Sequence, residues 1–169
     1  EVDALDRLAA AGVRVPKPYG CFDGVLLMEL VTSDDGEVAP RLNDISMSEE
    51  QALEDHYVVM QYVLRMLCTG LVHGDLSEYN VLLGGRGSVM APVIIDLPQA
   101  VDAAGNNHAQ RMLLRDVANL RDFFGQFAPE LLVTQYGPEM WSLYQSGLLS
   151  NETPLTGHYE RAHADVDMQ

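Results

Sequence analysis

The segment 73–80, with the sequence HGDLSEYN, limits the fold and chemistry of this chain more than any other feature. It places Asp75 five positions before Asn80, and a further acidic residue, Asp96, follows the apolar run 93–95. This spacing is typical of a phosphoryl-transfer site, where a carboxylate orients the attacking hydroxyl and accepts its proton. An amide oxygen and a second carboxylate suit Mg²⁺. The three side chains are therefore candidates for a catalytic base and metal ligands.

The composition indicates one globular domain with an acidic surface. The chain has 169 residues, 47% of them hydrophobic, which is enough to bury a core. Its formal charge is −15, from 25 acidic and 10 basic residues. Such a surface repels phosphate backbones, and the sequence shows no compact basic face. Direct binding of nucleic acid is therefore not expected.

Cysteine usage and hydropathy favour a cytoplasmic protein without membrane contact. Cys21 and Cys68 have neither the C-x-x-C spacing nor the histidine partners of a structural zinc site, which favours a reducing compartment. No apolar run reaches the roughly 18 residues of a membrane span. The first residues are acidic rather than typical of a signal peptide.

The first third of the chain predicts a helix followed by a β-hairpin. A helix is expected over 1–11 and ends before Gly12. A hairpin is expected to pair 19–22 with 25–31 around the turn Asp23-Gly24. Because 25–31 is nearly all apolar, we expect both faces of this strand to be covered.

The rest of the chain predicts a mainly helical body. Ser48 and Gln51 fit a capping box that starts a helix ending near Cys68. Strands are expected at 80–83 and 93–96, joined by a flexible turn at 84–88, and a second amphipathic helix at 110–127. Residues 130–148 should be helical in two pieces divided near Gly137, before a polar, frayed tail. The first long helix has a predicted apolar stripe of Leu53, Tyr57, Met60, Leu64 and Leu67.

The sequence around the motif is similar to that of one kinase family. Residues 71–80 (LVHGDLSEYN) and 94–101 (IIDLPQAV) strongly resemble the RIO family of atypical serine/threonine protein kinases, most closely its RIO1-type branch, bacterial members included. Residues 25–30 (VLLMEL) are similar to the family's hinge strand, and 115–119 (RDVAN) match a later helix. The resemblance covers roughly residues 1–127.

This resemblance implies an α+β, protein-kinase-like fold. The chain would hold mainly the helical C-terminal lobe, with the last hairpin and helix of the N-terminal lobe. On that basis residues 1–31 are the remnant of the N-terminal lobe, 32–149 the C-terminal lobe and 150–169 a polar tail.

The resemblance also implies the roles of the motif residues. Asp75 would be the catalytic base, and Asn80 and Asp96 would bind the Mg²⁺ or Mn²⁺ that accompanies ATP. Asp96 would also be able to accept a phosphate as an aspartyl intermediate.

The nucleotide contacts are implied in the same way. Backbone groups of Glu29 and Val31 would hold the adenine, with Met28 in the gatekeeper position behind it.

Departures from ordinary protein kinases carry their own expectations. Gly74 stands where most kinases have arginine, and Pro98 replaces the glycine of the D-F-G motif, which should stiffen that turn. There is little room for an activation segment, so its phosphorylation should not control the protein. No G-x-G-x-x-G loop or strand lysine is present, and the only lysine is Lys17. We therefore expect a fragment that binds ATP weakly and turns over slowly or not at all.

His73 is expected to be structural, and Asp116 is expected to accept hydrogen bonds from backbone N–H groups of the motif loop.

Other interpretations of the function of the chain remain open at this point. Besides a RIO-type kinase with an unidentified protein substrate, the chain could belong to an ATPase switch. It could also belong to a small-molecule phosphotransferase of the aminoglycoside or choline kinase kind, or to a non-enzymatic binding module.

Overall fold

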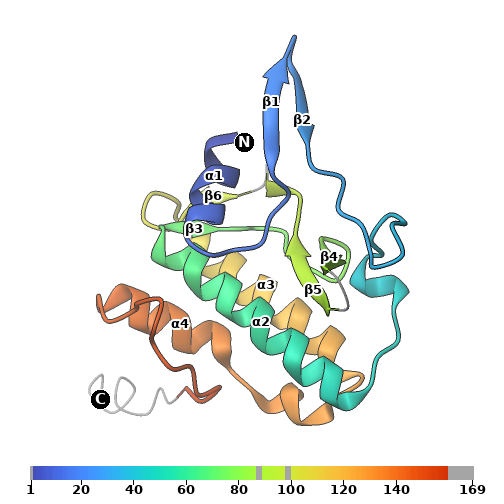
Figure 1. Cartoon of the computed structure of the whole chain (residues 1–169). Coiled ribbons are helices and arrows are strands. Elements are labelled where there is room, and N and C mark those ends of the chain that lie inside the picture. Colours follow the sequence, from blue (N-terminus) through green and yellow to red (C-terminus); the bar gives the residue numbers. More distant parts are fainter. Residues whose placement is uncertain (1, 87–88, 98–99, 160–169) are drawn as a thin grey trace, which may run out of the picture.

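A narrow hairpin projects from a body of packed helices in the computed structural model (Figure 1). The structure describes residues 2–86, 89–97 and 100–159. Helix α1 lies beside the base of the hairpin, and helices α2 and α3 pack together beneath it (Figure 1). The helices are α1 (Val2–Ala10), α2 (Glu49–Cys68), α3 (Ala109–Gly125) and α4 (Tyr136–Gln145), with short 3-10 helices η1 (Leu42–Asp44) and η3 (Pro129–Val133).

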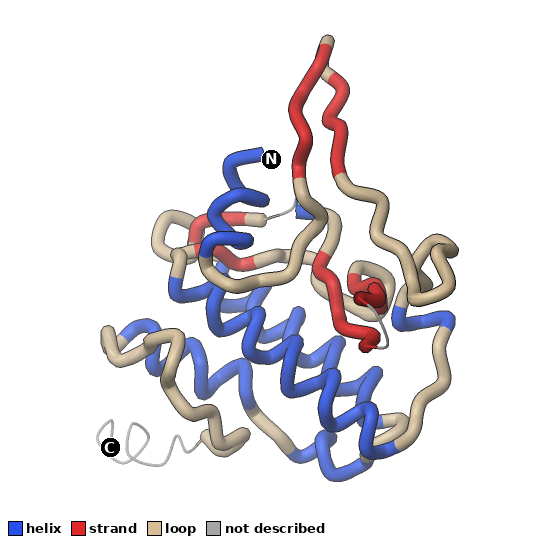
Figure 2. The backbone as a smooth tube through the Cα atoms, in the orientation of Figure 1, coloured by secondary structure: helices blue, strands red, loops and turns tan. Residues whose placement is uncertain are grey.

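The strands in the described part of the chain form antiparallel pairs (Figure 2). The hairpin pairs β1 (Pro18–Phe22) with β2 (Val25–Met28), and a second hairpin pairs β4 (Val81–Arg86) with β5 (Val89–Ile94). A short pair joins β3 (Leu71–Val72) to β6 (Val101–Asp102). Since β3 pairs with β6 and β4 with β5, the loops between β3 and β4 and between β5 and β6 lie next to each other.

The core lies between α2, α3 and the short strands. The capping prediction for α2 is confirmed, since the Ser48 hydroxyl accepts a hydrogen bond from the Gln51 N–H (3.1 Å). The predicted stripe is wrong at Tyr57, which is 65% exposed. At this point along α2 the residue that faces the core is His56, one position before Tyr57. None of the described helices combines the length and hydrophobicity that a bilayer crossing requires.

The hairpin also differs from its prediction. Strand β2 ends at Met28 rather than near residue 31, and its side chains are largely exposed, as is Leu30 (68%). The expectation of cover on both faces is therefore wrong for the described chain. The hairpin projects past the other described elements, and α1 contacts β1 (Figure 1).

Two further boundaries move for local reasons. Residues 84–86 continue β4 instead of forming a turn, and 87–88 lie outside the described residues. The two helical pieces of 130–148 separate at 134–135, ahead of Gly137, because Pro138 is accommodated in the first turn of α4.

The first part of the C-terminal segment is held against α4 rather than frayed. The buried Glu139 carboxylate accepts hydrogen bonds from the Thr156 N–H (2.8 Å) and the Gly157 N–H (2.9 Å). Residues 160–169, on which the rest of the tail prediction falls, lie outside the described residues.

The buried His56 predicts a pH-dependent stability. Burial lowers its pKa from the ordinary 6.5 to about 4, so the unfolded chain binds the proton more tightly. This contribution to stability is complete above pH 6.5 and is lost as the pH falls towards 4. Because this contribution is lost, the free energy of unfolding should fall by about 3 kcal/mol when the pH is lowered from 7 to 4.

Urea denaturation of wild type and His56→Phe at several pH values checks this expectation. The carboxylates titrate in both proteins, so the difference between the two pH profiles isolates the histidine. The exposed His108→Phe serves as the control and should retain the wild-type profile. Identical profiles for wild type and His56→Phe would contradict the prediction.

Candidate active site

Residues 95–97 lie next to the loop 73–80, and the two segments are joined through the backbone of Ile95. Its N–H donates to the Asn80 carbonyl (3.0 Å), and its carbonyl contacts His73 Nε2 (2.7 Å). These bonds bring the segment that carries Asp96 against the loop that carries Asp75. The structure therefore assembles the predicted motif residues from two separate parts of the sequence.

His73 is a structural residue of this loop. It is buried, and its Nδ1 accepts a hydrogen bond from the Asp75 N–H (3.2 Å). An accepting Nδ1 leaves the ring proton on Nε2, where it donates to the Ile95 carbonyl. The imidazole thus bridges the two loops, in agreement with the sequence prediction.

Helix α3 holds the backbone of the same loop from below. The buried Asp116 carboxylate accepts the N–H groups of Gly74 (2.8 Å) and Leu76 (3.0 Å), as predicted. Arg115 donates to the Gly74 carbonyl, and Asn119 to the Leu76 carbonyl (3.2 Å). Burial raises the pKa of Asp116, while the two backbone N–H bonds oppose that increase.

Gly74 has a conformational reason to be glycine. Its φ is +90°, a left-handed backbone conformation in which a Cβ is strained. The arginine of most kinase loops would be strained here. The turn at Gly74 directs its N–H and carbonyl towards α3, where both are bonded.

The three motif side chains differ in environment. Asp75 and Asp96 are exposed, whereas Asn80 is 7% exposed and donates through its amide nitrogen to the Asp75 carbonyl. That bond fixes the amide, so its oxygen is the atom available to a cation. Asp96 has a φ of +61°, unusual for a residue other than glycine. The proposed role of Pro98 falls outside the described residues.

A cavity of about 230 Å³ joins the hinge segment to Asp96. Met28, Glu29 and Val31 line it on one side, and Ile95 and Asp96 on the other. Asp75 and Asn80 do not line the cavity but belong to the adjacent loop. Thus four of the predicted site residues meet in one cavity, and two stand beside it.

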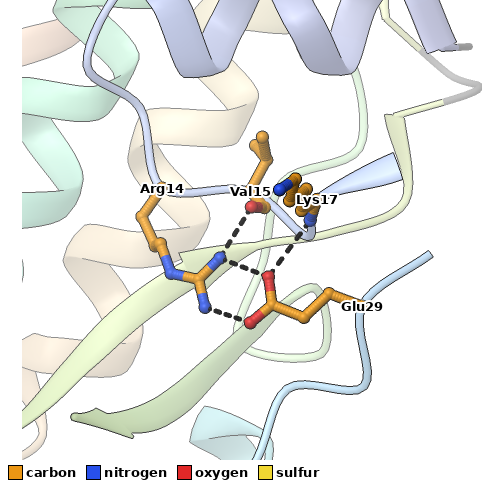
Figure 3. A network of polar contacts seen from close by, with 4 residues as sticks. All are labelled: Arg14, Val15, Lys17 and Glu29. Atoms are coloured by element: carbon orange, nitrogen blue, oxygen red, sulfur yellow. Dashed lines mark hydrogen bonds and ion pairs between the residues drawn. The ribbon is translucent and has the colours of Figure 1, made fainter. Parts of the chain in front are cut away.

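A clamp on the hinge was missed by the sequence analysis. Arg14 binds both carboxylate oxygens of Glu29 (2.8 and 2.7 Å), and one of these also accepts the Lys17 N–H (3.1 Å) (Figure 3). Bonding to Glu29 raises the pKa of Arg14. Extending the hairpin register beyond Pro18 and Met28 places Lys17 opposite Glu29, but it does not pair Arg14 with Glu29, so no local pattern indicated the clamp.

The donor set fits a hard divalent cation bound together with a nucleotide. No cluster of three or more histidine, cysteine, aspartate or glutamate side chains suited to a metal occurs among the described residues. Mg²⁺ typically takes only one or two protein carboxylates and completes its shell with water and phosphate oxygens. The amide of Asn80 and the carboxylate of Asp96 are both oxygen donors and match that requirement.

Comparison with known proteins decides the family. The family model described as the RIO domain matches residues 1–136. The chain belongs to the RIO family. The sequence-based assignment is therefore confirmed.

Several named kinases are relatives of this RIO chain. It is 43% identical over 120 residues to the RIO-type serine/threonine-protein kinase Rio1 of Haloferax volcanii, covering 71% of this chain and 39% of that protein. It is 39% identical over 125 residues to human serine/threonine-protein kinase RIO1, covering 73% of this chain and 21% of the human protein. It is 36% identical over 124 residues to the RIO-type serine/threonine-protein kinase Rio1 of Thermoplasma acidophilum, covering 73% of this chain and 61% of that protein. The RIO chain thus spans less than two thirds of each relative.

The fold comparison agrees with the family. A crystal structure of a kinase domain superposes with a TM-score of 0.50 at 17% identity, over 77% of this chain and 51% of that one. The predicted α+β, protein-kinase-like fold is therefore confirmed for this RIO chain.

Proposed function

We propose that this RIO chain is part of an ATP- and Mg²⁺-dependent kinase that phosphorylates serine or threonine of a protein. The observation that carries the proposal is the cavity shared by the hinge segment and Asp96, beside the loop of Asp75. The names of the relatives support the reaction class. The free cysteines, Cys21 and Cys68, support a reducing compartment such as the cytoplasm.

The cavity is the proposed nucleotide site. Backbone groups of Glu29 and Val31 bind the adenine edge, and Met28 lies against the base. Support comes from the lining of the cavity and from its volume of about 230 Å³, which suits a planar base. The ion pair between Arg14 and Glu29, which holds the hinge against the segment before β1, supports this assignment.

Asp75 is the proposed catalytic base. The substrate hydroxyl oxygen forms a bond to the γ-phosphorus as the bond to the ADP oxygen breaks, and Asp75 accepts the hydroxyl proton. Asn80 and Asp96 hold the Mg²⁺, or Mn²⁺ in its place, which neutralises phosphate charge when bound. The exposure of Asp75 supports access by a protein substrate. Transfer of phosphate to Asp96 itself is a variant of the same proposal.

The exposed hairpin supports the proposed domain division. Residues 1–31 are the remnant of an N-terminal lobe, 32–149 form the C-terminal lobe and 150–169 a polar tail. The apolar side chains of β1 and β2 that lie in solvent, including Phe22 and Leu27, are those that further strands would cover.

The isolated chain is expected to bind ATP weakly. Without a glycine-rich loop or strand lysine, the phosphates lack their usual backbone and cationic contacts. Millimolar Mg²⁺–ATP should raise its melting temperature by only about 1–2 °C in a thermal shift assay. A shift of ten degrees or more would show that the chain binds nucleotide fully without those parts.

A transfer assay tests the main proposal. The longest gene product that contains this chain is incubated with γ-labelled ATP and Mg²⁺, with and without a generic protein acceptor. Label should appear on serine or threonine of the acceptor or of the kinase itself. Release of inorganic phosphate without any protein label would contradict the kinase proposal.

The second candidate is an ATPase switch, in which water replaces the protein hydroxyl. It is favoured by the short connection between β6 and α3, residues 103–108, which leaves little room for a substrate-binding segment. The same assay distinguishes the two, because an ATPase releases phosphate without labelling protein.

A further inference from the structure

The segment that follows α4 turns back and is bonded to the start of that helix (Figure 1). The buried Glu139 carboxylate accepts the N–H groups of Thr156 (2.8 Å) and Gly157 (2.9 Å), and also the Thr156 hydroxyl (2.7 Å). The Gly157 carbonyl accepts the Gln135 N–H (2.7 Å). Residues 155–158, the C-terminal strap, are therefore fixed to α4 through backbone and side-chain bonds.

The strap fits closely against the helical body. Gly157 is buried with a φ of +78°, and a Cβ on it would lie 3.2 Å from the Tyr136 ring. Leu155 packs against the hydrophobic core and lines a cavity of about 170 Å³ together with Met60 and Leu131. The strap thus covers one side of a largely apolar cavity.

Neutral donors alone bind the charged group that holds the strap. The ion pairs among the described residues are Arg14–Glu29 and Arg121–Asp122, so no described cation pairs with Glu139. A buried charge requires hydrogen bonds, and those described at this carboxylate all come from the strap. The attachment is therefore sensitive to any negative charge that is added to the strap.

Thr156 is the position where such a charge has the largest effect. The residue is exposed, and its hydroxyl contacts the Glu139 carboxylate directly. A phosphate replaces the donor O–H with nearly two negative charges. Rotation of the group away from Glu139 also breaks the bond from the His158 N–H (3.1 Å). The start of α4 attracts an anion with only about half an elementary charge, less than the carboxylate repels it.

We propose that Thr156 is a phosphorylation site and that a phosphate on its hydroxyl releases the C-terminal strap from α4. The Thr156 oxygen forms a bond to the γ-phosphorus of ATP, the bond to the ADP oxygen breaks, and the hydroxyl proton passes to the base of the modifying serine/threonine kinase. Release removes Leu155 from the cavity and exposes its other apolar residues. The strap shares no residue with the hinge cavity, so this proposal does not depend on the proposed nucleotide site.

Hydrogen exchange of the Gly157 amide measures whether the strap is closed, because this N–H is bonded to Glu139. The whole chain is prepared unmodified and with phosphothreonine incorporated at position 156, and exchange is followed by NMR at pH 7. The phosphate removes one hydrogen bond and adds repulsion, so we expect about 100-fold faster exchange at Gly157. The amides of α3 should keep their rates, which shows that the fold is retained.

Three comparisons assign the effect to the added charge. Phosphothreonine at position 153 is the matched control, because the Thr153 hydroxyl is bonded to Ser150 and not to a carboxylate; Gly157 exchange should stay within about twofold of wild type. Thr156→Val loses the hydroxyl without adding charge and should accelerate exchange only about tenfold. In Glu139→Gln the side-chain amide can donate to the phosphate, so phosphorylation of Thr156 should accelerate exchange by less than about threefold.

The proposal fails if phosphate at position 156 leaves Gly157 exchange unchanged, or if phosphate at position 153 has the same effect. It fails also if the full acceleration persists in Glu139→Gln. Should that variant not fold, the comparison of the two phosphorylated positions decides by itself. Mass spectrometry of the gene product from its native cells should find phosphate on Thr156, and recovery of this peptide only in unmodified form would overturn the assignment of the site.

Discussion

Replacing Asp75 with asparagine is expected to reduce phosphoryl transfer by about 100- to 10,000-fold. The amide has nearly the shape of the carboxylate but cannot accept the proton of the attacking hydroxyl. The backbone bonds that fix this loop involve His73, Asn80 and α3 and not the Asp75 side chain, so the fold should be retained. The measurement is the initial rate of label transfer from γ-labelled ATP by the longest gene product.

Binding and stability separate a chemical loss from a structural one. The KM for ATP and the midpoint of urea unfolding should change little in Asp75→Asn. Asp102→Asn, an exposed aspartate on β6, is the control and should retain full activity. Undiminished transfer by Asp75→Asn would remove Asp75 from the mechanism.

Removing the Asp116 carboxylate with alanine should destabilise the fold by about 3–5 kcal/mol. The substitution leaves the buried N–H groups of Gly74 and Leu76 without their acceptor and creates a small cavity beside them. Because Gly74 has a positive φ, its N–H cannot turn elsewhere without disrupting the loop. Urea denaturation at pH 7 measures the change.

An aspartate on the same helix provides the matched comparison. Asp122 is exposed and contacts only its neighbour Arg121 among the described polar contacts, so Asp122→Ala should change the free energy of unfolding by less than about 0.5 kcal/mol. A loss in Asp116→Ala no larger than in Asp122→Ala would show that the loop does not depend on this carboxylate.

Local patterns predicted the long helices and the polar contacts near the motif. The cap at Ser48 follows from the capping-box pattern, and the acceptor role of Asp116 follows from the family resemblance of residues 115–119. Both predictions are confirmed. The roles of Asp75, Asn80 and Asp96 in catalysis stay predictions, although the structure brings their loops together.

Features set by tertiary packing could not be read from the same patterns. An apolar strand such as β2 indicates burial, but exposure depends on which elements reach it. Helical spacing gives a stripe about three residues wide and cannot decide whether His56 or Tyr57 faces inward. The Arg14–Glu29 clamp joins residues 15 positions apart, and no short-range pattern relates them.

The arginine contacts around α1 bear on the entropy cost of the proposed nucleotide binding. Arg7 donates to the Thr69 carbonyl (2.6 Å) and Arg65 to the Gly12 carbonyl (2.7 Å), which fastens the last turn of α1 and the residues after it to the end of α2. Arg14 then fastens the hinge to that same segment. The hinge side of the proposed nucleotide cavity is thus preorganised, so a nucleotide that binds there would lose little entropy in ordering it.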